Sequence, residues 1–440
     1  MFTQLQTLRG EIQRALSAGG CDNVKRRELH AKVELLRLDL EEEAIKAGAT
    51  FKLTPIRVVE KLTSSSGSAE KVVPAALKTV EPPSLSEGVR AELDEMVESL
   101  TLVPVRRPFR WWYWLDIVFR FVGVCMGFFT VGVFLSLLII FLRVVDSLLG
   151  LGPFDSISER LKRVICKFLL ILSGVEVLVE GLNRDAFNES CTLLTFTHAS
   201  NIDGFLVAYT CPIRHYALAK KELFYVPFFS WISIAIGGVP VDRENRDRAV
   251  AALKRTTEAA KRSKMCLVIA PEGTRSLTGQ LLPFKKGVSH MWDELKAPIV
   301  PMVLFGAWDL YPVGSWVNQC GHVAVRYLKP ILPEEIESRE QVTRIVRRRI
   351  LESLLSCPKI IGTDLNWTQR LTNVAVTLLN IAFDFYALLV MRNIAFARLG
   401  LSLHETLLYS AGAIATVTIG LYLAVTVGVE IVSPVKVKKC

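Results

Sequence analysis

A histidine and an aspartate five residues apart, His198 and Asp203, could together carry out acid–base chemistry in this 440-residue chain. Neutral imidazole is available near pH 7 and can accept a proton, and a carboxylate can fix its tautomer and stabilise the imidazolium. On a continuous α-helix five steps leave two side chains about 140° apart, so this pair can meet only across a turn. Because the chain has 6 histidines, one of them near an aspartate is unremarkable without further support.

The residues around the pair predict such a turn. CTLLTF (191–196) is apolar and threonine-rich, as expected of a buried strand, and ASN (199–201) supplies residues that favour helix N-caps. IDGFLVAYT (202–210) then continues an apolar pattern. We therefore expect His198 at the end of a strand or the start of a turn, and Asp203 in the first turn of a helix, where the carboxylate can fold back onto the imidazole.

Charged residues follow other apolar runs farther along the chain. They are Lys220, Arg243 and the run Glu272, Gly273, Thr274 and Arg275. Ligand sites in α/β sheets gather outside the carboxyl ends of strands, and Gly273 permits positive φ or close backbone approach. The two arginines suit bidentate phosphate contacts, to which Lys220 would add a point charge. Any one of them alone could equally be a solvated surface residue.

The order of apolar and polar segments predicts the fold class. Between about residue 155 and residue 355, apolar runs alternate with polar helical stretches. The expected strands are 174–181, 191–197, 215–220, 265–273, 299–306 and 322–330, and the clearest helices are 246–263 and 339–355. Such alternation predicts an α/β domain with a mixed sheet flanked by helices.

Composition indicates a membrane. Hydrophobic residues make up 51% of the chain and the net charge is +10, which favours an anionic bilayer surface or phosphate-bearing substrates over nucleic acid. The 9 cysteines form no CxxC pair and no zinc-like spacing, so the sequence predicts neither a metal site nor a disulfide framework, with reduced thiols facing the cytosol.

Three segments are candidates for the membrane itself. Residues 121–142 carry no charge and follow an arginine- and tryptophan-rich stretch suited to a headgroup interface. They could span the bilayer, dip into one leaflet and return, or form a buried helix. Residues 371–391 carry only Asp384, and residues 406–429 carry no charge. The terminal lysines 436 and 438 resemble a dilysine retrieval signal of endoplasmic reticulum membrane proteins, or simply flank the last membrane helix.

The chain divides into five regions. We expect an amphipathic helical region at 1–62, a flexible linker at 63–90, a membrane-anchoring helical segment at 91–150, the α/β domain at 151–360, and C-terminal membrane helices with a basic tail at 361–440. The first region has two apolar stripes: Leu5, Leu8, Ile12 and Leu16, then Leu29, Val33, Leu36 and Leu40. They predict either a helical pair packing on its own protein or a short coiled coil.

The motifs occur in a telling order. HxxxxD (198–203), GGVPVDR (237–243), PEGTRS (271–276) and APIVPMV (297–303) resemble the four blocks of the glycerolipid acyltransferase family. The closest likeness is to the lysophosphatidic acid (1-acyl-sn-glycerol-3-phosphate) acyltransferases, over about residues 160–345. One departure is Thr197, where many members have asparagine; this substitution bears on the choice of acceptor.

The resemblance implies an activity. His198 would act as general base on the sn-2 hydroxyl of lysophosphatidic acid, which attacks the acyl-CoA thioester to give phosphatidic acid, with Asp203 orienting the imidazole. Glu272 would order its loop or hold a glycerol hydroxyl. Gly273 and Thr274 would belong to the same substrate-binding loop, and Arg275, Arg243 and Lys220 would bind the phosphate. No metal or cofactor is implied, since acyl-CoA is a co-substrate.

Other activities stay open at this stage. The acceptor could be another lysophospholipid or glycerol-3-phosphate, the donor could be another lipid in a transacylation, or the chain could be a non-catalytic membrane scaffold. We expect acyl-CoA, the lysophospholipid and membrane lipids as partners, and no nucleic acid. The endoplasmic reticulum membrane is the expected location, with the catalytic domain on the cytosolic side, where acyl-CoA is available.

Overall fold

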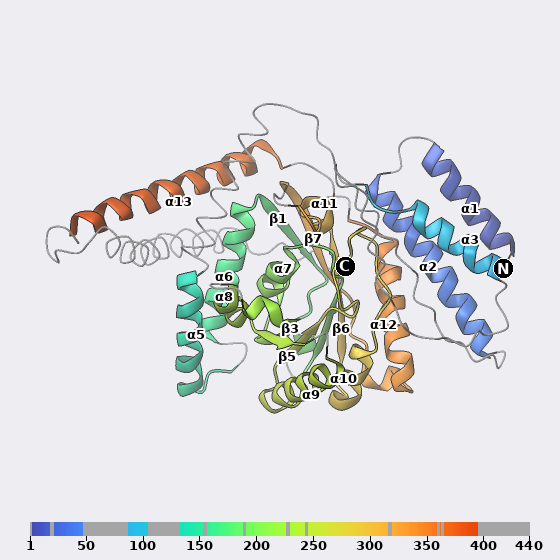
Figure 1. Cartoon of the computed structure of the whole chain (residues 1–440), viewed down its shortest axis with the longest axis horizontal. Helices are drawn as coiled ribbons and strands as arrows, with labels where there is room; N and C mark the ends of the chain where they lie inside the picture. The colour runs from blue at the N-terminus through green and yellow to red at the C-terminus, as the bar shows by residue number, and fades with distance from the viewer. Residues whose placement is uncertain are drawn as a thin grey trace. The chain divides into compact units, whose positions relative to one another are not determined.

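The computed structural model describes residues 2–17, 22–46, 87–103, 133–152, 156–187, 191–225, 229–242, 245–315, 319–358, 361 and 365–394. They belong to two compact units, one within residues 1–103 and the other within residues 104–440 (Figure 1). We describe each unit by itself.

In the described part of the first unit there are three helices: α1 (Phe2–Ser17), α2 (Asn23–Lys46) and α3 (Glu87–Ser99). Six of the eight residues in the predicted stripes are buried in one apolar cluster, and Leu16 and Leu36 pack against it. Helix α3 completes this core with Leu93, Met96, Val97 and Leu100. The amphipathic helices therefore pack on their own protein. Helix α3 begins at Glu87, inside the interval that the sequence assigned to the linker.

The second unit is built on a sheet, which has seven strands in the part of the chain that is described. They are β1 (Val175–Glu180), β2 (Leu193–Phe196), β3 (His215–Lys220), β4 (Gly238–Val241), β5 (Cys266–Ile269), β6 (Ile299–Phe305) and β7 (Gly321–Tyr327), in the order β1-β7-β6-β2-β5-β3-β4. All neighbours pair in parallel except β6 and β7, which are antiparallel. The prediction of a mixed sheet is confirmed.

Helices cover both faces of the sheet (Figure 1). The helices of this unit within the described residues are α5 (Val133–Leu148), α6 (Ile157–Leu172), α7 (Asp203–Thr210), α8 (Phe229–Ala235), α9 (Arg246–Ser263), α10 (Gly287–Leu295), α11 (Ala307–Leu310), α12 (Arg339–Leu354) and α13 (Trp367–Ile394), of which α13 extends away from the sheet (Figure 1). Helix α9 has the predicted bounds because a capping residue lies at each of its ends. The side chain of Asn245 accepts from the Arg248 N–H at the start, and Lys264 adopts the left-handed conformation at the end.

The predicted membrane segments are only partly described. Residues 133–142 form the first part of α5, residues 371–391 lie in α13, and residues 121–132 and 406–429 are outside the described residues, as is the lysine-containing tail. Within the described ranges, we find no helix that combines the length and the apolarity needed to cross a bilayer.

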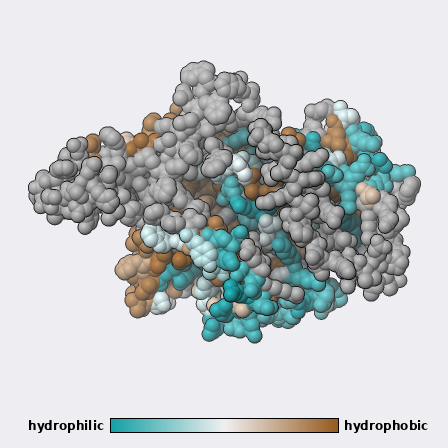
Figure 2. Space-filling view, viewed as in Figure 1, coloured by the Kyte–Doolittle hydropathy of each residue, from teal (hydrophilic) through white to brown (hydrophobic). Residues whose placement is uncertain are grey.

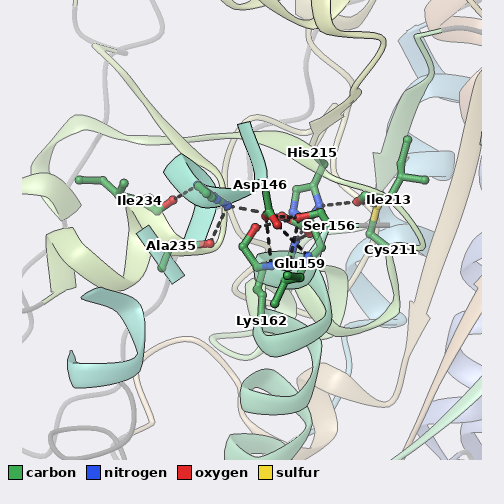
Figure 3. Close-up of polar contacts among 12 residues, drawn as sticks. Asp146, Ser156, Glu159, Lys162, Cys211, Ile213, His215, Ile234 and Ala235 are labelled. Atoms are coloured by element: carbon green, nitrogen blue, oxygen red, sulfur yellow. Dashed lines mark hydrogen bonds and ion pairs between the residues drawn. The ribbon is translucent and has the colours of Figure 1, made fainter. Parts of the chain in front are cut away.

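A buried polar network joins α5, α6, α8 and the start of β3 (Figure 3). Lys162 is fully buried; its ammonium pairs with Glu159 and lies 3.4 Å from His215 Nδ1. Arg143 reaches in from α5, donates to the carbonyl oxygens of Ile234 (2.8 Å) and Ala235 (2.7 Å), and lies 3.6 Å from Glu159 Oε1. Polar contacts therefore connect the inner side of α5 to the rest of this unit.

Candidate active site

The turn between β2 and α7 brings His198 and Asp203 together. The distance from His198 Nδ1 to Asp203 Oδ2 is 2.8 Å, and the same oxygen accepts the backbone N–H groups of Ala199 and Ser200 at 2.8 Å each. Asp203 is the first residue of α7, where the helix dipole favours a carboxylate. Strand β2 ends at Phe196, so both local predictions for this turn are confirmed.

The imidazole is oriented for proton transfer. Because an Asp203 carboxylate can only accept, the hydrogen bond places the proton of a neutral His198 on Nδ1 and leaves Nε2 as the acceptor. The His198 side chain is 22% exposed, whereas that of Asp203 is 1% exposed. The carboxylate is therefore buried beside Nδ1, and part of the imidazole is exposed to solvent.

Glu272 holds the neighbouring loop against this turn. It is buried, its Oε1 accepts the His198 N–H (2.8 Å), and its Oε2 accepts the Leu282 N–H (2.9 Å). Burial raises the pKa of Glu272 to about 8, and the N–H donors of His198 and Leu282 oppose that rise. Both oxygens already accept a backbone donor, which is the geometry of the loop-ordering role rather than of a glycerol ligand.

Gly273 lets the loop turn under a lysine. Its φ is +69°, and a Cβ built there would lie 2.6 Å from Lys285 Cδ. The N–H of Ser276 donates to the His198 carbonyl oxygen at 2.9 Å, which is a second hydrogen bond between this loop and the His198–Asp203 turn. A side chain at residue 273 would displace Lys285 and strain the backbone.

Arg275 and Thr274 are exposed on this loop. The Arg275 guanidinium donates through Nη1 to Asn201 Oδ1 in the His198–Asp203 turn. The structure therefore brings the arginine predicted to bind phosphate to the same turn as the dyad.

Another predicted site residue, Lys220, lies nearer the sheet's edge. Lys220 ends β3, is exposed, and lies 3.6 Å from Glu222 Oε2. Arg243 lies outside the described residues. Its neighbour Asp242 forms ion pairs with Lys221 (2.9 Å) and Arg248 (3.6 Å). Strands β3 and β2 are separated by β5, so Lys220 shares the carboxyl edge of the sheet with His198 rather than a direct contact.

Comparisons with known proteins bear on this geometry. The sequence pattern of the family described as Acyltransferase matches residues 178–305, which include the dyad and the Glu272 loop. The chain is therefore similar to this family over residues 178–305.

Named relatives agree with this family. The chain is 32% identical over 174 residues to a 1-acyl-sn-glycerol-3-phosphate acyltransferase of Cocos nucifera, covering 40% of this chain and 56% of that one. It is 35% identical over 168 residues to the protein of that name from Saccharomyces cerevisiae (38% and 55%), and 25% identical over 207 residues to the human alpha form (47% and 72%). The chain thus spans just over half the length of the coconut and yeast relatives.

A solved structure is also similar. The 1-acyl-sn-glycerophosphate (LPA) acyltransferase PlsC from Thermotoga maritima shares 22% identity, with a TM-score of 0.45, over 54% of this chain and 96% of that one.

Thr197 has a structural task in this unit. Its Oγ1 accepts the Leu304 N–H at 2.9 Å, and its own N–H donates to the Met302 carbonyl oxygen at 3.3 Å. Thr197, which replaces the asparagine of many family members, therefore joins the end of β2 to β6, and its hydroxyl points toward the sheet.

The candidate site also contains residues that the sequence did not single out. Ser200 Oγ donates to the Tyr311 carbonyl oxygen at 2.7 Å, and Asn201 contacts Arg275. Arg347 reaches from α12 to the Leu282 carbonyl oxygen at 2.7 Å and stacks on Phe284. The only sequence signal for Ser200 and Asn201 is their position inside the HxxxxD block. The sequence signal for Arg347 is the helical spacing of Val342, Val346 and Ile350. Their apolar side chains face the core, and Arg347 lies beside them on the helix.

The described part of the chain contains no group of three or more histidine, cysteine, aspartate or glutamate residues that could hold a metal ion. The chemistry available to the described residues is proton transfer by an oriented imidazole beside a cationic loop.

Proposed function

We propose that this protein transfers a fatty acyl group from acyl-CoA to the sn-2 hydroxyl of lysophosphatidic acid, giving phosphatidic acid. The observation that carries the proposal is the partly exposed imidazole of His198, held at 2.8 Å by a buried Asp203 that two further N–H groups fix in place. The coconut, yeast and human relatives, whose names specify this acceptor, support the choice of substrate.

The proposed mechanism needs no acyl-enzyme intermediate. His198 Nε2 takes the proton of the acceptor hydroxyl as its oxygen attacks the thioester carbonyl carbon. The tetrahedral intermediate collapses, the C–S bond breaks, and the CoA sulfur leaves with the proton held by the imidazolium. Asp203 stabilises that imidazolium through Nδ1 and keeps Nε2 directed at the substrate.

The acceptor's phosphate is proposed to bind Arg275, with Lys220 and Arg243 adding positive charge. Arg275 already lies against the His198–Asp203 turn, and a guanidinium fork matches two phosphate oxygens. The phosphate would then fix the distance between the hydroxyl and the imidazole, which is where most of the rate gain from positioning arises.

Helix α5 supports a membrane location because it is apolar on its exposed side as well as toward the core. Leu137, Phe141, Val144 and Leu148, spaced 4-3-4 along one side, are all exposed, whereas Asp146 is buried and Arg143 points into the unit. Figure 2 shows hydrophobic surface over α5, at the lower left. A continuous apolar face indicates contact with lipid or protein, and a lipid acceptor favours the bilayer.

We extend this proposal to location. The protein would act at the endoplasmic reticulum membrane with its catalytic unit on the cytosolic side, where acyl-CoA is available. The apolar face of α5 would lie in the outer part of the cytosolic leaflet, and lysophosphatidic acid would enter the site from that leaflet.

A thiol-release assay with detergent-purified protein tests the activity. Oleoyl-CoA would be offered with lysophosphatidic acid, lysophosphatidylcholine or glycerol-3-phosphate, using wild type, His198→Ala and the matched control His290→Ala on α10. We expect release with lysophosphatidic acid in wild type and His290→Ala, and none in His198→Ala. Release with a different acceptor alone would contradict the substrate, and none from folded wild type would contradict the function.

A further inference from the structure

Asn201 connects three loops at the edge of the site. Its backbone N–H donates to the Tyr311 carbonyl oxygen at 3.4 Å, and its Nδ2 donates to the Pro312 carbonyl oxygen at 3.5 Å. Its Oδ1 accepts from Arg275 Nη1. The residue thus lies between the loop after α11, the His198–Asp203 turn and the Glu272 loop.

These contacts fix which way the amide points. Only the NH2 end of an asparagine can donate to a carbonyl oxygen, so the contact with Pro312 leaves Oδ1 to face Arg275. Ser200 strengthens the arrangement, since its Oγ donates to the Tyr311 carbonyl oxygen and its backbone bridges Pro312. An otherwise exposed arginine is therefore held by an acceptor whose own position is set by neighbouring backbone.

We propose that Asn201 is a positioning residue that orients Arg275 toward the acceptor's phosphate without neutralising it, and so sets the preference for phosphate-bearing acceptors. The proposal rests on the proposed function. It goes beyond that function by assigning substrate preference to a side chain that contacts Arg275 instead of the reacting atoms.

The absence of charge on the asparagine is the central point. An amide oxygen takes up one of the five donors of a guanidinium and leaves its full positive charge for the substrate. A carboxylate at the same position would form an ion pair with Arg275 and compete directly with the phosphate. Asn201→Asp keeps the size of the side chain and changes only its charge and its donors, which makes it the informative variant.

The test is a double-mutant cycle read by binding. Calorimetry would measure the Kd for lysophosphatidic acid in detergent micelles, without acyl-CoA, for wild type, Asn201→Asp, Arg275→Met and the double variant. Since binding needs no turnover, all four proteins can be measured. We expect Asn201→Asp to raise the Kd about fivefold beside Arg275, and less than about twofold in the Arg275→Met background. Equal changes in the two backgrounds would overturn the proposal.

Turnover separates positioning from general damage to the site. Asn201→Asp should raise the KM for lysophosphatidic acid and leave kcat within about twofold, because the dyad is untouched. The matched control Asn183→Asp changes the same atoms at an exposed turn, where Asn183 Oδ1 accepts the Asp185 N–H, and should alter neither constant. A fall in kcat with unchanged KM would overturn the proposal.

A second variant, Asn201→Ala, keeps the proposal testable if Asn201→Asp does not fold. If Asn201→Asp lowers the melting temperature, Asn201→Ala, which removes the acceptor without adding charge, is compared instead and should raise KM less than the aspartate does. An alanine effect as large as the aspartate effect would overturn the role of charge. The wild-type protein distinguishes the two hypotheses: no transfer to lysophosphatidic acid refutes the proposed function, whereas transfer with an indifferent Asn201→Asp refutes only this inference.

Discussion

Asp203 determines which nitrogen of His198 is free to act as a base. If an amide replaced its carboxylate, its oxygen would keep the Ala199 and Ser200 N–H groups without the negative charge that stabilises the imidazolium, or its NH2 group would face Nδ1, reverse the tautomer and leave Nε2 protonated. For Asp203→Asn we therefore expect kcat to fall by about three orders of magnitude with little change in folding. Steady-state acyl transfer and circular dichroism measure the two effects. A variant with nearly full kcat would show that the carboxylate does not set the tautomer.

The raised pKa of Glu272 predicts that the stability of the fold depends on pH. Its pKa is raised from 4.5 to about 8, chiefly by burial. Between these values the folded state keeps a proton that the unfolded state has lost, so the contribution is complete below pH 4.5 and is lost as pH rises to about 8. Glutamine does not titrate. The difference in unfolding free energy between wild type and Glu272→Gln should fall by up to about 1.4 kcal/mol per pH unit across this window.

Denaturant unfolding at a series of pH values between those limits would measure that difference. A gap between the two proteins that stays constant with pH would contradict the assignment of a raised pKa to Glu272. The sequence predicted Glu272 as a site residue but not its burial. That burial depends on how its own loop folds back at Leu282 and on α12, which brings Arg347 close to it.

Charged side chains are buried beside the apolar contacts between α5 and α6. The ammonium of Lys162 is buried beside Glu159, and Lys162→Met would leave that carboxylate without its nearest cation. We expect a loss of about 3–5 kcal/mol in unfolding free energy, since a buried unpaired charge is costly. Lys162→Met with Glu159→Gln should cost less than the two single changes added together. Strictly additive losses in denaturant unfolding would contradict this coupling.

The elements themselves were unequally predictable. Helix α9 has end signals in its own sequence, and β3 and β6 are long apolar runs, so their bounds followed from local pattern. Strand β4 was missed because GVPV is four residues long, contains a proline and pairs only with β3 at the sheet's edge. The contact of Asn201 with Arg275 depends on two loops 74 residues apart, which no local pattern reveals.

At the scale of the whole molecule, the apolar face of α5 predicts lipid binding. Phe141 is 62% exposed and Val144 is 56% exposed, so replacing both with aspartate should leave the folded core intact. We expect the fraction bound to phosphatidylcholine–phosphatidylserine vesicles to fall severalfold. The control Val250→Asp alters a similarly exposed apolar residue on α9 and should bind as wild type does. Equal losses in the two proteins would mean that α5 is not the lipid-facing surface.

The central claim is that His198 catalyses acylation of lysophosphatidic acid at its sn-2 hydroxyl, and product analysis tests it most directly. Purified wild-type protein and His198→Ala would be incubated with oleoyl-CoA and 1-acyl lysophosphatidic acid. The lipid product would then be identified by mass spectrometry and digested with phospholipase A2. The account predicts phosphatidic acid whose oleate is released by that digestion in the wild-type reaction, and none in the variant. Phosphatidic acid formed equally by His198→Ala, or no phosphatidic acid from the folded wild type, would contradict it.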